Sequence, residues 1–369
     1  MAEPLVARYG ISVAHNIADA IIAVHPQFKR EAFIVDCSEG FEALGLMDRG
    51  RKIARALRKH LPDGYAQTIE ILMRSVADTR IESTNMSSFV FLPHVYFVAD
   101  YGLDHFEASM KAQYELTQRF TAEFSIRNYL EKYPDQTLAR LAVWATDPSP
   151  HVRRLVSEGT RPRLPWAKRL PQFQKDPRPI LKLLEQLKDD ESLYVRRSVA
   201  NNLNDIWKDN PDAVIEVART WLTDAPKQRK QQLVLHALRS AIKQGNVEVL
   251  ELIGFNREPR VSIQDIQFFP SPARIGESIA ISFRVENQNA QVLHLLIDIQ
   301  VGFVKANGTV RNKVFKLTST QLPPGQSHKC TLTLKLHQMT TRTHYVGTHP
   351  VAALINGKPH PLGSFEITE

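Results

Sequence analysis

The sequence predicts an all-α superhelix of repeated helices, a solenoid, followed by an all-β sandwich of the immunoglobulin-like type. A change of pattern along the chain predicts this order. From about Ile11 to Gly254, apolar residues recur at the period of a helix, in stretches of about 10 to 16 residues. After Phe255 they alternate with polar residues, as in half-buried strands. We therefore expect two domains, a helical domain over residues 1–257 and a sandwich over residues 258–369.

The early helices are indicated by stripes of apolar residues three or four positions apart. These stripes are Ile17, Ile21 and Ile22; Ile53, Leu57 and Leu61; and Ile69, Leu72 and Val76. A further helix is expected around Phe120, with Phe120 and Phe124 on its apolar side. Arg119, Glu123 and Arg127 would then share another edge of that helix. Such a row is usually an ordinary surface ladder of ion pairs, but this one comes about one repeat before a similar edge described next.

A partial repeat in the helical region indicates the solenoid. Asp147–Trp166 has the sequence DPSPHVRRLVSEGTRPRLPW, and Asp189–Trp207 has the sequence DDESLYVRRSVANNLNDIW. In both, an acidic turn leads into a helix that opens Val-Arg-Arg, at Val152 and again 43 residues later at Val195. The apolar faces of the two helices are expected to be core. Their opposite edges carry Arg154 and Glu158 in the first copy, and Arg197, Asn201 and Asp205 in the second. Stacking would align these edges into one surface, which we expect to be a binding groove.

Trp166 lies in a stretch between the two copies that contains five prolines, at positions 162, 165, 171, 177 and 179. Proline excludes a regular helix there, so short turns hold this tryptophan. It either packs beneath the loop or projects from the solenoid among basic residues, an arrangement that suits nucleic acid. Trp144, Trp207 and Trp221 fall within helical periodicity and are expected in the core.

The C-terminal region predicts about seven short strands separated by turn signals such as Asn-Gly and Pro-Pro-Gly. The expected strands are Val261–Phe268, Ser278–Val285, Leu293–Phe303, Val314–Leu317, Cys330–Leu336, Val351–Ile355 and a last strand ending near Ile367. With Cys330 as its single cysteine, the sandwich has no disulfide between its sheets.

Composition narrows the function classes. The net charge of +8 and the pI near 9.4 favour a polyanionic partner, although a merely basic protein would have the same values. The chain has no apolar run of 18 residues and its first residues do not form a signal peptide, so we expect a cytoplasmic protein that binds no membrane. Cys37 and Cys330 cannot build a metal site, a His344–His349 pair is too small for one, and we expect no cofactor. Without a coiled coil or an exposed apolar stripe, a monomer is expected.

Two stretches resemble one enzyme family. Ser157–Ala167, SEGTRPRLPWA, and Ala200–Pro211, ANNLNDIWKDNP, are similar to the AlkC-type DNA alkylation-repair glycosylases, relatives of the AlkD type in the HEAT-like repeat superfamily. The similarity covers residues 1 to about 255, and the C-terminal region matches members with an immunoglobulin-like domain. The resemblance implies a bacterial-type enzyme that acts on double-stranded DNA containing alkylated bases. It implies hydrolysis of the N-glycosidic bond of cationic bases such as 3-methyladenine and 3-methylcytosine, without base flipping.

The resemblance also implies roles for individual residues. Asp205 would stabilise the oxocarbenium-like sugar and the attacking water, with assistance from Glu123, and Trp166 would contact the damaged nucleotide. Arg154 and Arg161 would bind phosphates around the lesion. Arg197 and Arg127, on the same expected edges, are further candidates for DNA contacts, and the sandwich would clasp the duplex from the other side.

The alternative is a non-enzymatic HEAT-like scaffold or DNA-binding adaptor, since most solenoids are scaffolds. A scaffold gains nothing from carboxylates in a phosphate-binding groove, because they repel DNA. Glu123 and Asp205 therefore favour catalysis.

Overall fold

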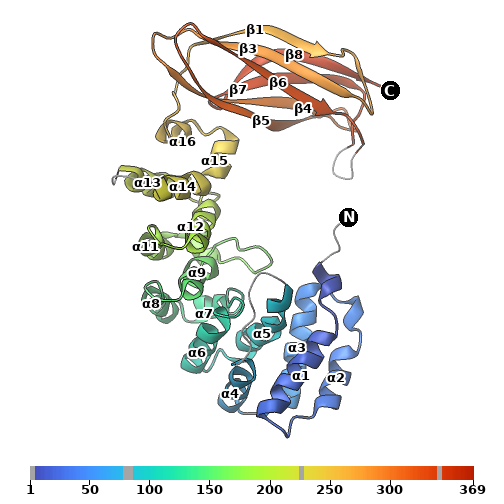
Figure 1. Cartoon of the computed structure of the whole chain (residues 1–369), viewed down its shortest axis with the longest axis vertical. Helices are drawn as coiled ribbons and strands as arrows, with labels where there is room; N and C mark the ends of the chain where they lie inside the picture. The colour runs from blue at the N-terminus through green and yellow to red at the C-terminus, as the bar shows by residue number, and fades with distance from the viewer. Residues whose placement is uncertain (1–4, 78–85, 224–227, 339–342) are drawn as a thin grey trace. The chain divides into compact units, whose positions relative to one another are not determined.

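The computed structural model describes residues 5–77, 86–223, 228–338 and 343–369. The chain divides into two compact units, Met1–Ala237 and Leu238–Glu369. The first unit is helical, and the second contains the β-strands (Figure 1). The predicted fold class, a helical region followed by an immunoglobulin-like β-sandwich, is confirmed.

The helical unit consists of short helices joined by tight connections. Its α-helices are α1 (Ser12–Val24), α2 (Arg30–Ser38), α3 (Leu46–His60), α4 (Tyr65–Val76), α5 (Leu92–Tyr101), α6 (Phe106–Thr117), α7 (Ile126–Lys132), α8 (Pro134–Trp144), α9 (Pro150–Gly159), α10 (Pro171–Lys175), α11 (Arg178–Leu187), α12 (Leu193–Ile206), α13 (Pro211–Thr223) and α14 (Gln228–Ala237). Turns of 3-10 helix are formed by η1 (Leu5–Arg8), η2 (Phe41–Ala43) and η3 (Met86–Phe91).

The two Val-Arg-Arg segments lie in α9 and α12, which pack against each other, and α12 in turn packs on α14. Figure 1 shows α8, α11 and α13 along one side of this stack and α9, α12 and α14 along the other. Val152, Val156, Val195 and Val199 are fully buried between the layers. Trp144, Trp207 and Trp221 are also buried, as their periodicity predicted.

The helix predicted around Phe120 is wrong. Helix α6 ends at Thr117 and α7 begins at Ile126, so Glu123 lies in the connection between them. The Thr121 hydroxyl accepts a hydrogen bond from the backbone N–H of Glu123 at 3.2 Å and donates one to its carboxylate at 2.8 Å. A threonine that bonds the residue two positions on offers the backbone an alternative to the helix. The edge formed by Arg119, Glu123 and Arg127 on one helix therefore does not exist.

The second unit begins with two short helices, α15 (Arg239–Gln244) and α16 (Val247–Leu252). The unit boundary comes earlier in the chain than the expected one at residue 257 because these helices pack with the strands. Gly245 and Gly357, both with positive φ, bring their backbones so close that a Cβ on either would overlap the other. Gly245 ends α15 and Gly357 lies in the turn between two strands, so this approach attaches the helix to the sandwich.

The strands form two packed sheets with orders β1-β3-β6 and β2-β8-β7-β4-β5. They are β1 (Val261–Phe269), β2 (Ala273–Arg274), β3 (Ser278–Asn287), β4 (Leu293–Val304), β5 (Val310–Leu322), β6 (Ser327–Lys335), β7 (Gly347–Ile355) and β8 (Lys358–Thr368). Neighbouring strands are antiparallel, except that β2 pairs with β8 in parallel. The seven predicted strands are confirmed, and β5 is longer than expected. The two-residue β2 was not predicted.

The turn between β7 and β8 is built around Asn356, which has a φ of 47° and a buried side chain. Its amide oxygen accepts a hydrogen bond from the N–H of Leu296 at 2.7 Å, and its amide nitrogen donates to the carbonyls of Asn256 and His294 at 2.8 and 3.1 Å. Asn356 therefore links the β7–β8 turn to β4 and to the segment that enters the sandwich.

Candidate active site

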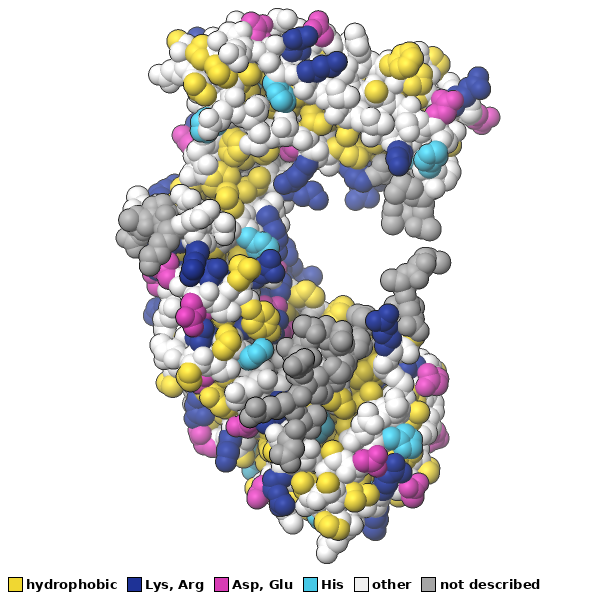
Figure 2. Space-filling view, in the orientation of Figure 1, with side chains coloured by type: hydrophobic (Ala, Val, Ile, Leu, Met, Phe, Trp, Pro, Cys, Tyr) yellow, Lys and Arg dark blue, Asp and Glu magenta, His cyan; other side chains and the backbone are white. Residues whose placement is uncertain are grey.

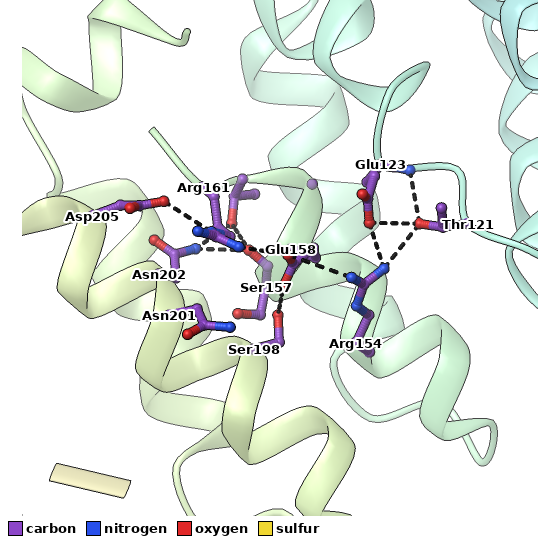
Figure 3. A network of polar contacts seen from close by, with 12 residues as sticks. Thr121, Glu123, Arg154, Ser157, Glu158, Arg161, Ser198, Asn201, Asn202 and Asp205 are labelled. Carbon is purple, nitrogen blue, oxygen red and sulfur yellow. Dashed lines mark hydrogen bonds and ion pairs between the residues drawn. The ribbon is translucent and has the colours of Figure 1, made fainter. Parts of the chain in front are cut away.

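The helical unit contains a row of five side chains of alternating charge, which we call the charge row: Glu123, Arg154, Glu158, Arg161 and Asp205. Nη1 of Arg154 lies 2.5 Å from Oε2 of Glu123, and its Nη2 lies 3.4 Å from Oε1 of Glu158. Nη1 of Arg161 lies 2.7 Å from the same Oε1, and its Nε lies 2.8 Å from Oδ2 of Asp205. Figure 3 shows Glu158 between the two arginines, with Glu123 and Asp205 at opposite ends of the row. The row connects the α6–α7 connection, α9, the segment after α9, and α12.

Spacing within the helices builds this row. Arg154 and Glu158 lie one turn apart on α9. On α12, Ser198, Asn202 and Asp205 face α9: the Ser198 hydroxyl donates to Oε2 of Glu158 at 2.5 Å, and Nδ2 of Asn202 donates to the Ser157 carbonyl at 2.7 Å. These contacts hold α12 in register with α9.

The charge row is largely buried, and the pKa values of its three central residues are shifted by their neighbours. Burial raises the pKa of Glu158, but the guanidinium groups of Arg154 and Arg161 lower it more, so the pKa lies below its ordinary value of 4.5. Burial lowers the pKa of Arg154 and of Arg161, but the neighbouring carboxylates outweigh it, so the pKa of each guanidinium is raised above its ordinary value. The guanidinium groups of Arg154 and Arg161 are therefore occupied by carboxylates. The structure does not place them as free phosphate ligands.

Glu123 lies on the wall of an open pocket of about 580 Å³. Aromatic rings from distant segments line much of the rest: Phe89, Phe120, Phe124, Trp166 and Tyr194. The guanidinium carbon of Arg154 lies 5.3 Å from the centre of the Tyr194 ring. Oε2 of Glu123 receives Arg154 and Thr121, whereas its Oε1 accepts no hydrogen bond from any described residue. Glu123 thus lines a pocket with aromatic walls, and one of its carboxylate oxygens has no hydrogen-bond donor among the described residues.

Trp166 projects into solvent at this pocket, with 66% of its surface exposed. Of the two possibilities that the sequence left open, packing beneath the loop is excluded. Its φ of 63° lies in the left-handed region, which is unfavourable for a residue with a large side chain. The surrounding loop is held by hydrogen bonds from the N–H of Leu170 to the Pro162 carbonyl and from the N–H of Ala167 to the Leu164 carbonyl.

Arg127, expected to contact DNA, is fully buried instead. Its guanidinium donates to the backbone carbonyls of Gly159, Arg161 and Lys168, at the two ends of the loop that carries Trp166. Burial lowers its pKa to about 10. The fully buried side chain leaves no N–H of Arg127 facing solvent, so the phosphate contact expected of Arg127 has no support in this structure and stays untested.

Asp205 is almost completely buried and does not line the pocket beside Glu123. Its Oδ2 receives Arg161, and its Oδ1 lies 3.0 Å from Nζ of Lys208, a half-exposed lysine on the same helical segment. The structure therefore joins Asp205 to Glu123 through the charge row, and does not bring both acids into one pocket.

Arg197 is exposed, but it lies away from the charge row. It lines a small depression between α12 and α14 together with Arg229 and His236. Among the described residues, Arg197 and Arg229 have no carboxylate partner. On the face shown in Figure 2, lysine and arginine side chains are interspersed with acidic ones over both units.

Sequence reasoning missed the aromatic lining and Thr121. The repeat contained a signal for one part of it: Tyr194 precedes the second Val-Arg-Arg segment as His151 precedes the first, and their rings meet at 5.7 Å in a T-shaped contact. Both line the pocket. Phe89 and Phe120 come from connections whose conformation no periodicity predicts.

The described residues contain no group of three or more His, Cys, Asp or Glu side chains arranged to hold a metal ion. None of the described helices combines the length and the apolar character that crossing a bilayer requires.

Comparison with known proteins identifies the family. Residues 27–244 match the family described as "DNA alkylation repair enzyme", and residues 262–369 match the C-terminal Ig-like domain named after the uncharacterised protein YhaZ. YhaZ of Bacillus subtilis (strain 168) is 36% identical over 360 residues, 97% of this chain and 98% of YhaZ. The structure of the Pseudomonas fluorescens alkylpurine DNA glycosylase AlkC, bound to DNA containing an abasic site analog, is 36% identical, with a TM-score of 0.88 over 100% of both chains. The chain therefore belongs to the DNA alkylation repair enzyme family and is an AlkC-like member that carries the YhaZ-type C-terminal Ig-like domain.

Proposed function

We propose that this protein is a DNA glycosylase that hydrolyses the N-glycosidic bond of cationic alkylated bases, 3-methyladenine and 3-methylcytosine, in double-stranded DNA. The observation that carries the proposal is that one pocket is lined both by Trp166, whose ring is exposed, and by Glu123, whose Oε1 accepts no hydrogen bond from a described residue. An electron-rich ring and a carboxylate are the two groups that attract a positive charge. The full-length similarity to an alkylpurine DNA glycosylase supports this use of the pocket.

Cleavage of the N-glycosidic bond would not require a general acid to protonate the leaving base. A base that carries a positive charge is already a good leaving group, so the sugar, which becomes oxocarbenium-like, is the centre that needs stabilisation. Oε1 of Glu123 would lie near this charge and orient the attacking water, while Arg154 and Thr121 hold Oε2 in place. Trp166 would lie against the damaged nucleotide. An open pocket does not require that the base be extruded into a closed cavity.

Asp205 would act after a rearrangement of one side chain. Among the described residues, the side-chain partner of its Oδ1 is Lys208, which is half-exposed. A DNA phosphate competes for that ammonium, because lysine is a common phosphate ligand. Movement of Lys208 onto the backbone would free Oδ1, while Arg161 still holds Oδ2. Asp205 would then be the second acid that stabilises the sugar.

DNA binding would use basic residues without an internal partner. Arg197 and Arg229 meet this condition among the described residues, so we assign phosphate contacts to Arg197 and not to Arg127. The sandwich would act as a DNA clamp in a protein that works as a monomer.

The test is release of methylated bases from DNA treated with a methylating agent, measured by chromatography for the intact protein, Glu123→Gln and Asp205→Asn. The matched control is Asp190→Asn, which also removes a buried carboxylate paired with an arginine, Arg153, away from the pocket. We expect both site variants to lose about 100-fold or more of the release rate while they still bind DNA, and the control to retain it. Release by neither variant nor wild type, with DNA still bound, would favour the adaptor. Equal losses in the control would show that the acids act only through stability.

A further inference from the structure

We infer that Arg127 is a positioning residue for the proposed glycosylase reaction: it clamps the loop that carries Trp166 and so holds the exposed ring at the pocket. This inference rests on the proposed function for its effect on the reaction rate. The clamp itself is a property of the free protein, so it can be tested without any substrate.

Arg127 uses its hydrogen-bond donors to bridge the loop. Nη1 donates to the carbonyls of Gly159 at 3.1 Å and Arg161 at 2.7 Å, and Nε and Nη2 donate to the carbonyl of Lys168 at 2.9 and 2.5 Å. Gly159 and Arg161 lie where the chain leaves α9, and Lys168 lies just after Trp166. One planar guanidinium therefore bridges both ends of the loop. A lysine ammonium could not reproduce this fork.

Arg127 is also buried without a counter-charge beside it in the described part of the chain. No carboxylate of a described residue lies within ion-pair distance of Arg127, although the side chain is fully buried. Two other buried arginines have carboxylate partners: Arg153 pairs with Asp190, and Arg161 pairs with Glu158 and Asp205. Arg196 is like Arg127 in that its printed bonds go only to backbone carbonyls, those of Asp190 and Glu191. A buried cation that bonds only to carbonyls is unfavourable as a means of stabilising a fold. Its geometry is explained by the loop that it holds.

Trp166 is itself held in an unfavourable conformation. The ring gains little from burial, because most of its surface is exposed, and its backbone has a left-handed conformation. Nothing in the ring's own contacts accounts for this conformation. Strained residues persist only where the surroundings fix them from several sides. Arg127 supplies such fixation through its bonds to the loop carbonyls, and an ion pair between Arg163 and Asp209 ties the same loop to the segment after α12.

The clamp is tested with Arg127→Lys and Arg127→Gln, each made in the full chain with Trp166 and with Trp166→Phe. For each protein, the time-resolved fluorescence anisotropy of Trp166 is obtained by subtracting the signal of the Trp166→Phe version from the signal of the version that keeps Trp166. We expect this signal to follow overall tumbling in the wild type and to gain a fast local component on the nanosecond scale in both Arg127 variants. Arg153→Lys is the matched control, because it alters a buried arginine that donates to the carbonyls of Asp147 and Pro148, and it should leave the Trp166 signal unchanged.

A double-mutant cycle on single-turnover base release separates positioning from stability. We expect Arg127→Lys to slow release about 10- to 100-fold, and to add less than twofold once Trp166 is already phenylalanine. Equal effects of Arg127→Lys in the presence and absence of Trp166 would overturn the positioning role, as would a rigid Trp166 signal in both variants. If a variant does not fold, the anisotropy of Trp166 in the wild type still tests the clamp, because fast local motion of the ring in the wild type would contradict it. Absence of base release in the wild type would remove the proposed function but leave the anisotropy result intact.

Discussion

Replacing Glu158 by glutamine removes the central negative charge of the charge row and keeps its shape. Glu158 receives a charge-assisted hydrogen bond from Arg161 at 2.7 Å and one from Ser198 at 2.5 Å, and it forms the 3.4 Å ion pair with Arg154. Loss of one member of a buried ion pair costs about 3–5 kcal/mol. Both arginines keep a second carboxylate here, so we expect a smaller loss in the free energy of unfolding, about 3 kcal/mol.

The assay is urea denaturation followed by tryptophan fluorescence. All four tryptophans lie in the helical unit, so this signal reports its unfolding alone. Glu107→Gln is the matched control: Glu107 pairs with Arg140 at a similar distance, 2.8 Å, but is exposed, and its loss should change the free energy of unfolding by less than about 1 kcal/mol. A Glu158→Gln protein within about 0.5 kcal/mol of the wild type would refute the reasoning, because the charge row would then contribute no net stability.

The pH dependence of the same comparison gives an independent check. The pKa of Glu158 is lowered in the folded protein, so its carboxylate stabilises the fold above the ordinary value of 4.5, and this contribution is lost as the pH falls through the folded pKa. The difference between wild type and Glu158→Gln should therefore be full at pH 6 to 7 and shrink as the pH falls below 4.5. A difference that grows on acidification would contradict the assigned sign.

Three further predictions concern other parts of the chain. Trp166→Gly should raise the free energy of unfolding by about 1 kcal/mol, since glycine adopts a positive φ without strain, and urea titration would reveal a loss instead if the ring stabilised the fold. Burial lowers the pKa of His94 from 6.5 to about 4, so the unfolded chain binds a proton at a higher pH than the folded protein does. The free energy of unfolding of the wild type should therefore fall by about 3 kcal/mol between pH 6.5 and 4. His94→Phe should show a smaller fall over this range, and an equal fall in both proteins would contradict the prediction. Asn356→Ala should lower the free energy of unfolding of the second unit, measured by calorimetry, by about 2–4 kcal/mol. The control Asn307→Ala, at an exposed turn, should lower it by less than about 1 kcal/mol, and similar values for the two variants would contradict the role of Asn356.

The fold was predictable from the sequence because its two signals are strong. Helical and strand periodicities separate cleanly in this chain, and the Val-Arg-Arg repeat identified the two helices that pack together. Periodicity failed at Phe120, where a threonine side chain competes with helix formation. The helical pattern also could not show that α15 and α16 belong with the sandwich, because their attachment depends on a close approach of two glycines far apart in sequence. No local pattern contains that contact.

The candidate site was predictable only in part. The resemblance to a known family pointed to Glu123, Asp205 and Trp166, and their roles in catalysis stay predictions. Which arginine bonds to what could not be predicted, because Arg127, Arg154 and Arg161 have the same chemistry and differ only in their surroundings. One clamps carbonyls and two hold carboxylates, and each of these partners comes from another segment.

The exposed ring of Trp166 has a thermodynamic consequence for any ligand that covers it. Two-thirds of a tryptophan surface is about 160 Å² of mostly apolar area, kept in contact with water in the free protein. Covering it would release about 4 kcal/mol of hydration free energy and lower the heat capacity of the complex by about 70 cal/mol/K. Because the loop is already fixed, little of this gain would be spent on ordering it. The exposed aromatic surface of Trp166 would thus contribute part of the binding free energy of a ligand that covers it.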